Sequence, residues 1–315
     1  MSPLALGADI GGTKILTALV NEAGHVERSW RTLTGAARGG EAVMAALEEA
    51  IAAALAEIGD VPLVGIGVSA AGQVDHARGR IAYASPNIPG WSGMPVRDRL
   101  AARFGLPVVV DNDGNAAAYG EWWAGSGRDL DALVMITVGT GIGGGIVQDG
   151  RVLRGARWRG GEVGHMILIA DGLRCNCGQP GCWEVYASGT AIARMAREAR
   201  PDWAPESPAV FEAAAGGDAI ANAVLDDAAR YLALGLVSLS SVLDPPLFLL
   251  GGGVASQPSY LPRVLSALED PAVSGDRGFD PARLALASLG NAAGAIGAAG
   301  EVFRAQGHLK DPRRA

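Results

Sequence analysis

Short apolar runs separated by glycine turns alternate along the chain with longer stretches of Ala, Leu and Glu. Residues 4–10 (LALGADI) form an apolar run that predicts a strand, and a glycine turn and a second strand follow. Residues 40–58 consist almost entirely of strong helix formers and predict a helix. The apolar runs PLVGIGV, PVVVD and PPLFLL predict further buried strands. This alternation of strands and helices is typical of an α/β fold.

The order strand, glycine turn, strand occurs over residues 4–20 and again over residues 131–148. Helical patterns follow at 188–199 and 218–243, another helix is expected to begin near Asn115, and small residues predict a last helix near the C-terminus. The repeat indicates a duplicated α/β domain with a nucleotide cleft between the halves. Two unrelated α/β units with incidental hairpins would give the same pattern.

The composition is that of a globular protein more than of a nucleic-acid or membrane protein. Hydrophobic residues make up 49% and charged residues 19% of the chain, which argues against disorder. The net charge of −7 argues against a general nucleic-acid binder, which needs a basic surface. No apolar run is long enough for a membrane span, and the N-terminus lacks the basic start of a signal peptide. We therefore expect a cytoplasmic protein without a membrane or nucleic-acid partner.

The loop DIGGTK, Asp9–Lys14, follows the first predicted strand. Glycines allow close approach of a phosphate, and Thr13 and Lys14 add a hydroxyl and a positive charge. The loop matches neither a P-loop nor a dinucleotide-binding fingerprint. A carboxylate at Asp9 would repel phosphate unless a divalent cation lay between them, which favours a site for a metal–nucleotide complex. A tight β-hairpin turn is the alternative interpretation.

Two further glycine loops follow apolar strands. The first is GTGIGGG, in which Thr140 adds a hydroxyl between Gly139 and Gly141. The second is the run Gly251–Gly253. Either loop alone is more typical of a turn, but ligands of α/β sheets collect at the carboxyl ends of strands.

Four polar residues, Asp111, Asn112, Asp113 and Asn115, occupy a predicted strand-to-helix junction. Helix capping accounts for one of them but not for all four. A carboxylate at such a strand end is well placed to accept a hydroxyl proton during phosphoryl transfer. We favour Asp113 as this base, with Asp111 as the alternative.

All three cysteines of the chain, Cys175, Cys177 and Cys182, lie in the stretch CNCGQPGCWE. His165, one of only four histidines, precedes them by ten residues. Three thiolates and one imidazole form a common tetrahedral zinc set, and four protein ligands leave no open position for water. The pattern therefore predicts a structural zinc ion, with three ordinary buried thiols as the alternative. Glu162 and Glu184 flank the cluster, where solvated surface charge is the simpler interpretation.

In this order, the motifs DIGGTK, DNDGNAAAYGE, GTGIGGG, GGEVGH, CNCGQPGC and LLGGG resemble the ROK family. This family contains bacterial sugar kinases and related repressors within the actin-like ATPase superfamily. The resemblance extends from about residue 4 to about residue 300 and is most specific at GEVGH with the cysteine motif. The sequence departs from the family pattern at two positions. Ala71 stands where Pro is usual, and Gly114 stands where Ala is usual.

The resemblance implies an α/β fold of two actin-like, ribonuclease H-like domains with an interdomain cleft. The first domain would comprise residues 1–112 plus a C-terminal helix at 291–306. The second domain would comprise residues 113–290 and would carry the zinc knuckle. A homodimer or homotetramer is also expected.

The family motifs imply a role for each matching residue. Asp113 resembles the catalytic base, and Asp9 would face magnesium and the phosphates. One nitrogen of His165 would bind zinc and the other would face the sugar. The residues that match sugar ligands are Asn87, Asn112, Asp113, Glu162, His165 and Glu184. Those that match the nucleotide site are Asp9, Gly11, Gly12, Thr13, Lys14, Gly139, Thr140, Gly141, Gly251, Gly252 and Gly253. Those that match zinc ligands are His165, Cys175, Cys177 and Cys182.

The implied activity is ATP-dependent phosphorylation of a hexose at its 6-hydroxyl, with ATP, Mg²⁺ and a structural Zn²⁺. Glucose is the favoured substrate because Glu162, His165 and Glu184 offer acceptors for a fully hydroxylated pyranose. Fructose, mannose, allose or an N-acetylhexosamine are the alternatives, and polyphosphate is an alternative phosphate donor. A sugar-responsive repressor is disfavoured, because a helix-turn-helix domain would have to precede Asp9.

Overall fold

The computed structural model describes residues 2–84, 88–276 and 278–309. Residue contacts group the chain into two compact units. The first consists of Met1–Leu133, Gly145–Gly161 and Ser288–Ala315, and the second of Val134–Gly144 and Glu162–Ala287. The domain boundary expected after residue 112 stays a prediction, since this grouping reports compactness alone.

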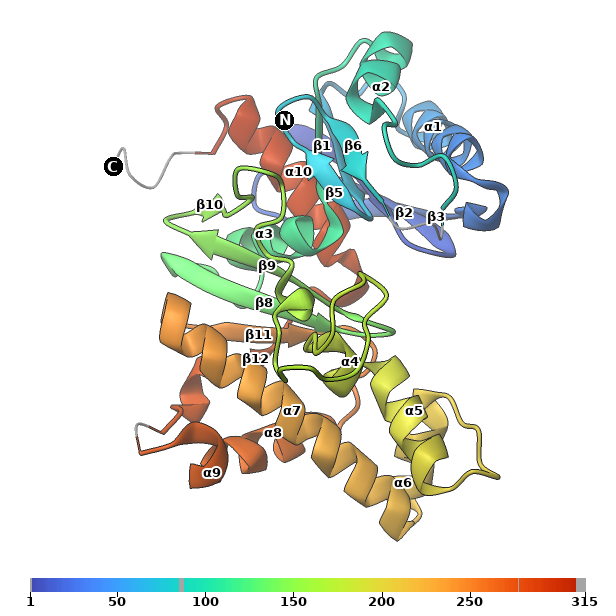
Figure 1. The fold of residues 1–315 in the computed structure, drawn as a ribbon. Coiled ribbons are helices and arrows are strands. Elements are labelled where there is room, and N and C mark those ends of the chain that lie inside the picture. Colours follow the sequence, from blue (N-terminus) through green and yellow to red (C-terminus); the bar gives the residue numbers. More distant parts are fainter. Residues whose placement is uncertain (1, 85–87, 277, 310–315) are drawn as a thin grey trace. The chain divides into compact units, whose positions relative to one another are not determined.

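The first sheet has five strands in the order β3-β2-β1-β4-β7 (Figure 1). Strand β1 pairs antiparallel with β2 and parallel with β4, and β4 pairs parallel with β7. The parallel strands β1, β4 and β7 therefore bring their carboxyl ends to one edge. The bounds are β1 Leu4–Ile10, β2 Lys14–Asn21, β3 Val26–Leu33, β4 Leu63–Ala70 and β7 Val108–Asn112.

Helices cover both faces of this sheet because side chains alternate along each strand. Leu6 of β1 joins a core with helices α1 and α2, whereas Ala5 joins a core with the C-terminal helix α10. The bounds are α1 Gly40–Ile58, α2 Val96–Phe104 and α10 Ala293–Ala305. A small antiparallel pair, β5 Gln73–Asp75 and β6 Arg80–Tyr83, lies between β4 and α2 in the sequence.

Helix α3, Asp113–Ala124, continues directly from β7. It begins two residues earlier than the sequence predicted, because the Asn112 side chain caps it by accepting a hydrogen bond from Asn115 N. The helix packs closely on α10. A Cβ atom at Gly297 of α10 would lie 1.7 Å from the carbonyl oxygen of Ala116, so only glycine permits this approach.

The second sheet also has five strands, in the order β10-β9-β8-β11-β12. Strand β11 pairs parallel with both β8 and β12, and β9 pairs antiparallel with β10. The bounds are β8 Ala132–Val138, β9 Ile142–Gln148, β10 Arg151–Val152, β11 Phe248–Gly251 and β12 Leu284–Leu286. Two mixed five-stranded sheets of this kind agree with the two actin-like α/β domains expected from the sequence.

Helices of the second unit follow the cysteine segment at residues 175–182 and strand β11 in the chain (Figure 1). Their bounds are α4 Glu184–Ala187, α5 Gly189–Ala199, α6 Ser207–Ala215, α7 Ala219–Leu243, α8 Tyr260–Glu269 and α9 Pro271–Ser274. Helix α7 begins after Asp218, whose side chain accepts a hydrogen bond from Ala221 N, and ends at Asp244 in the left-handed region. Pro245 and Pro246 follow and prevent its continuation.

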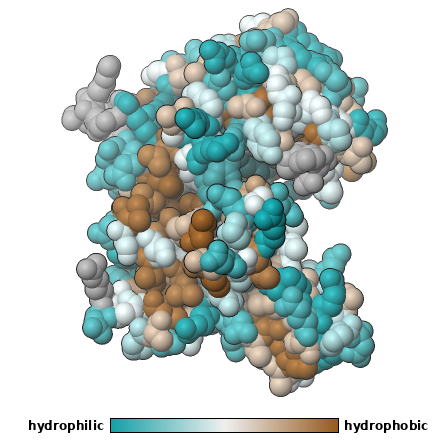
Figure 2. All heavy atoms as spheres, viewed as in Figure 1, coloured by the Kyte–Doolittle hydropathy of each residue, from teal (hydrophilic) through white to brown (hydrophobic). Residues whose placement is uncertain are grey.

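On the face drawn in Figure 2, polar side chains predominate and strongly hydrophobic ones gather over the second sheet. Among the described residues, no helix is both long and apolar enough to cross a membrane.

Candidate active site and metal centre

The junction of β7 and α3 holds Asp113 in a network of short hydrogen bonds. Asn112 Nδ2 donates to Asp113 Oδ1 (2.8 Å) and to the carbonyl of Gly72 (2.9 Å). The backbone N–H of Gly114 also donates to Asp113 Oδ1 (2.9 Å). Both donors act on the same carboxylate oxygen, so they orient the group while Oδ2 can accept a proton.

Asp111 and Asp113 lie in different surroundings, although the sequence left them as rivals. Asp111 is 2% exposed, and Arg154 donates to its Oδ2 from Nε at 2.9 Å. Asp113 reaches solvent, yet protein surrounds it closely enough that desolvation raises the pKa of its carboxyl above the usual value. A raised pKa makes a carboxylate a better proton acceptor. The ion pair thus engages Asp111, whereas the carboxylate of Asp113 reaches solvent, and the assignment of Asp113 as the base stays a prediction.

Asp9 lies at the end of β1 and accepts a hydrogen bond from the hydroxyl of Ser69 at the end of β4. Burial raises the pKa of Asp9 to about 6, the negative charge of Asp113 adds to the shift, and the Ser69 hydrogen bond opposes it. Asp113 follows β7, which is separated from β1 by β4 in the sheet, and two carboxylates that repel each other at one sheet edge are suited to share a divalent cation.

The DIGGTK loop is a tight hairpin turn closed by a hydrogen bond from Gly11 N to the carbonyl of Lys14 (3.0 Å). Thr34 ties the loop to the end of β3, donating from its Oγ1 to the carbonyl of Gly11 (2.7 Å). Gly12, Thr13 and Lys14 are exposed at its tip. The hairpin interpretation is therefore correct for the backbone, and the exposed tip stays a predicted phosphate loop.

The second glycine loop is tied to Glu184, the first residue of α4. Ile142 N donates to Glu184 Oε2 (2.9 Å), and a Cβ atom at Gly141 would lie 2.2 Å from the same oxygen. Gly189 N donates to the carbonyl of Gly139 (2.7 Å), and the hydroxyl of Thr190 donates to the carbonyl of Thr140 (2.7 Å). A predicted phosphate loop and a predicted sugar ligand are thus parts of one hydrogen-bonded assembly.

The third glycine run turns sharply at the end of β11. Gly252 has a φ of 90°, and a Cβ atom there would lie 2.5 Å from the carbonyl oxygen of Val138 at the end of β8. Val254 N donates to the same carbonyl (3.0 Å). Gly253 has open space around its Cα, so its backbone is accessible to a ligand.

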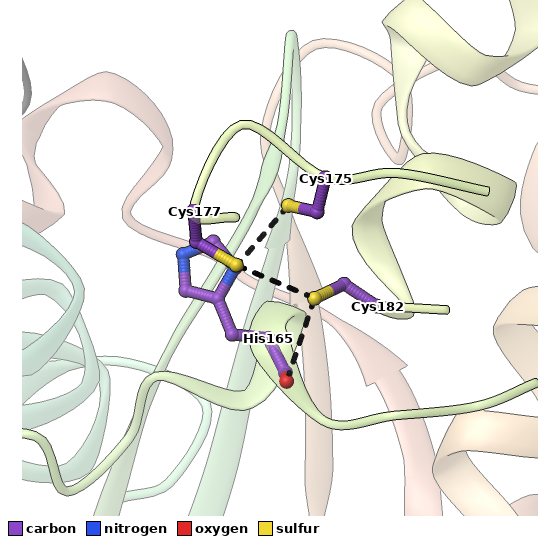
Figure 3. A group of neighbouring side chains, drawn as sticks. All are labelled: His165, Cys175, Cys177 and Cys182. Carbon is purple, nitrogen blue, oxygen red and sulfur yellow. Dashed lines mark hydrogen bonds between the residues drawn. The ribbon is translucent and has the colours of Figure 1, made fainter. Parts of the chain in front are cut away.

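The three thiols and His165 come together as the sequence predicted (Figure 3). Cys177 Sγ lies 3.5 Å from Cys182 Sγ, and Cys175 Sγ lies 3.7 Å from His165 Nδ1. Tetrahedral zinc with bonds of about 2.0–2.3 Å requires ligand separations of about 3.5–3.8 Å. The four residues therefore fit a zinc ion in both donor type and spacing.

The three thiols differ in their surroundings. Burial raises the pKa of the Cys182 thiol to about 12 and also raises the pKa of Cys175, so a bound cation would be needed to hold these two as thiolates. At Cys177, desolvation is outweighed by hydrogen bonds from the Gln179 backbone and the neighbouring thiols, which lower the pKa. All three cysteines are free of disulfides. The alternative of three unrelated buried thiols does not account for this arrangement.

His165 ends a short 3-10 helix, Val163–His165, and has a different neighbour at each ring nitrogen. Its Nδ1 faces Cys175, while its Nε2 lies 3.8 Å from Glu162 Oε2. Both side chains are 35% exposed. The ring can thus bind metal through Nδ1 and still present Nε2 beside a carboxylate. Asn87, the remaining predicted sugar ligand, lies outside the described residues.

Two residues that contact Asp9 and Asp111 were not predicted from the sequence. Ser69 bonds Asp9 and Arg154 bonds Asp111, from positions 60 and 43 residues away in the chain. Neither belongs to a glycine loop or a polar cluster, so no local signal marked them.

The ROK family model matches residues 5–303 of the chain. The chain belongs to the ROK family. It is 37% identical to a glucokinase of Halalkalibacterium halodurans over 308 residues, covering 93% of this chain and 92% of the relative. It is also 36% identical to an N-acetylmannosamine kinase of Yersinia pestis, covering 83% of this chain and 87% of the relative.

Solved structures of ROK proteins agree with this assignment. A ROK glucokinase from Streptomyces griseus in complex with glucose and AMPPNP has a TM-score of 0.80 and 36% identity, covering 94% of this chain and 98% of its own. A ROK hexokinase from Thermus thermophilus has a TM-score of 0.85 and 37% identity, covering 97% and 100%. The resemblance recognised in the sequence is confirmed for nearly the whole chain.

Proposed function

We propose that this ROK protein phosphorylates the 6-hydroxyl of a hexose with ATP, and that glucose is its preferred substrate. The observation that carries the proposal is the orientation of Asp113 by Asn112 and Gly114 at the end of β7. The glucokinases with 36–37% identity, one of them solved with glucose and an ATP analogue, support the choice of substrate and donor.

In this reaction Asp113 accepts the proton of the attacking hydroxyl, a role typically worth about 10²–10⁴-fold in rate. Asn112 and Gly114 both donate to Oδ1 of the carboxylate, which leaves Oδ2 to accept the proton of the hydroxyl group. Asp9 would hold Mg²⁺, which neutralises charge on the phosphates when ATP is bound. The exposed glycine-loop backbones would position the phosphates.

The sugar hydroxyls would be bound by Asn87, Asn112, Glu162, His165 and Glu184. Zinc would hold His165 through Nδ1 and keep Cys182 in place, two residues before Glu184. Because Glu184 also accepts from Ile142 N, the metal would fix both the orientation of a sugar ligand and the position of a glycine loop. The zinc would act through structure and would not activate water.

The direct test is Asp113→Asn, assayed with glucose and ATP by coupled detection of ADP. We expect turnover to fall at least 10²-fold, by loss of the base, with unchanged circular dichroism and zinc content. Asp60→Asn, at an exposed position, is the matched control. Near-normal turnover of Asp113→Asn would refute the assignment of the base.

Substrate choice is tested separately, because the N-acetylmannosamine kinases are as similar in identity as some glucokinases. A panel of glucose, mannose, fructose, allose, N-acetylglucosamine and N-acetylmannosamine is compared by kcat/KM. We expect glucose to rank first, and a higher kcat/KM for an N-acetylhexosamine would reassign the substrate. The same panel with polyphosphate replacing ATP tests the donor, and light scattering tests the predicted homodimer or homotetramer.

A further inference from the structure

A buried ionic cluster joins the end of β7 to helix α10 within the first unit. Arg154, two residues beyond β10, donates from Nε to Asp111 Oδ2 (2.9 Å) and from Nη2 to Glu301 Oε2 (2.6 Å). The Asp111 and Glu301 side chains are 2% and 5% exposed, and that of Arg154 is 16% exposed. Charges buried this deeply are unfavourable unless each is paired with good geometry.

The same place could be mistaken for a second metal site. His76, Asp111 and Glu301 offer ligand atoms that lie within 4.8 Å of one another. However, Arg154 Nη2 lies 2.7 Å from Asp111 Oδ2 and 2.6 Å from Glu301 Oε2. The guanidinium already stands between the two carboxylates, and its positive charge would repel a metal ion. The cluster is therefore an ionic bridge.

This bridge continues into the residues that orient the base. Asp111 Oδ1 accepts from the backbone N–H of Asn112 (2.8 Å) and from Asn115 Nδ2 (3.2 Å). Asn112 in turn caps α3 and donates to Asp113 Oδ1. Arg154, Asp111, Asn112 and Asp113 thus form one unbroken chain of hydrogen bonds.

We propose that Arg154 is a positioning residue for phosphoryl transfer, which holds Asp111 against Glu301 and thereby fixes the carboxylate of Asp113. This inference rests on the proposed kinase reaction. The planar guanidinium bridges two carboxylates with fixed geometry, which the single ammonium group of lysine cannot reproduce. A shift of the base by about 1 Å can lower the rate by about 10²-fold. Arg154 therefore acts on the turnover number without touching the substrate.

The test compares Arg154→Met, Arg154→Lys and the matched control Arg99→Met in the full chain. Arg99, on α2, also bridges two carboxylates, and these belong to Glu41 and Glu48, which are not predicted site residues. We expect Arg154→Met to lower kcat about 10–100-fold while KM for ATP stays within about twofold. Arg154→Lys should recover the melting temperature far more than kcat, and Arg99→Met should keep kcat.

Arg154→Met removes the guanidinium that pairs with two buried carboxylates, so the variant can fail to fold. The double variant Arg154→Met with Glu301→Gln removes one of these charges and should lose the same fraction of kcat. Hydrogen exchange at the Gly114 and Asn115 amides adds a readout that does not need sugar turnover. We expect faster exchange there in both Arg154→Met variants and unchanged exchange in Arg99→Met.

The possible results separate the inference from the proposed function. Absence of wild-type turnover on every hexose would refute the kinase assignment and leave the exchange data to decide whether Arg154 orders the turn. An active wild type with unchanged kcat in a folded Arg154→Met variant would overturn the positioning role alone. Full recovery of kcat by Arg154→Lys would also overturn it, by showing that charge suffices.

Discussion

Replacing Gly297 by Ala tests whether the contact of α3 with α10 controls both stability and the position of Asp113. A Cβ atom at this position would lie 1.7 Å from the carbonyl oxygen of Ala116 and 2.7 Å from Gly120 N. Both neighbours belong to the backbone of α3, so no side chain can rotate away. Normal van der Waals separation would require the helices to move apart by about 1.5 Å, given that good C···O contacts lie above about 3 Å.

Two opposing free-energy terms decide the outcome. Alanine inside a helix is about 1 kcal/mol more favourable than glycine. Overpacking of a close contact costs about 1–3 kcal/mol, and more where the backbone cannot yield. Because both contacting atoms are backbone atoms, we expect the steric cost to exceed the propensity gain by about 2 kcal/mol. That corresponds to a melting temperature lower by about 3 °C for a chain of this size.

The assay is thermal unfolding by calorimetry, with turnover measured at a temperature at which the variant stays folded. Gly216→Ala is the matched control, because its nearest neighbour would be the carbonyl of Ala213 at 3.3 Å and its φ is −76°. We expect little change in the control and a lower kcat in Gly297→Ala, since α3 begins at Asp113. An unchanged or higher melting temperature for Gly297→Ala would refute the reasoning, because helix propensity alone predicts that result.

Three further predictions address the metal, the pH dependence and a buried acid. Removal of zinc with a chelator, or Cys177→Ala, should lower the affinity for glucose far more than the affinity for ATP, as measured by titration calorimetry. An equal loss of both affinities would show that the cysteine segment only supports folding in general. Because burial raises the pKa of Asp9 to about 6, KM for Mg-ATP should rise as the pH falls below 6. Because the pKa of Asp9 is raised in the folded state, deprotonation of Asp9 lowers the stability of the folded state as the pH rises through 6. Asp9→Asn should therefore have a higher melting temperature than wild type at pH 7, and its KM should lose this pH dependence. The same pH dependence of KM in the variant would contradict the assignment to Asp9. Finally, Glu121 is fully buried and accepts hydrogen bonds from Ser126 N, Ser288 Oγ and Leu289 N. Glu121→Gln should therefore lower the free energy of unfolding, measured with denaturant, by about 1–3 kcal/mol. An unfolding midpoint equal to that of wild type would show that these hydrogen bonds are dispensable.

Local patterns in the chain were sufficient for most of the secondary structure. The predicted strand at 4–10 and helix at 40–58 have the bounds of β1 and α1. The helices expected at 188–199 and 218–243 begin one residue later in the structure, after their capping residues Ser188 and Asp218. Apolar periodicity and caps are properties of neighbouring residues, so they can be read without the fold.

The cluster of His165 with the three cysteines was also recognisable from the sequence, because all four residues lie within 18 consecutive positions. Metal-ligand spacing and donor chemistry restrict such a short segment strongly. The role of Glu184 as acceptor for the second glycine loop was not recognisable, since Ile142 lies 42 residues away.

The sequence by itself thus determined the α/β class, the family, the glycine turns and the cluster of His165 with the three cysteines, since each of these depends on residues close together in the chain. Only the tertiary structure showed that Asp111 and Asp113 have different surroundings. Asp111 pairs with Arg154, 43 residues away, and Arg154 pairs in turn with Glu301, a further 147 residues along the chain. The tertiary structure likewise showed why α10 contains Gly297, whose partner is a backbone carbonyl of α3. Burial and pairing of charges are properties of the packed chain, and no local pattern encodes which distant residue will supply the partner.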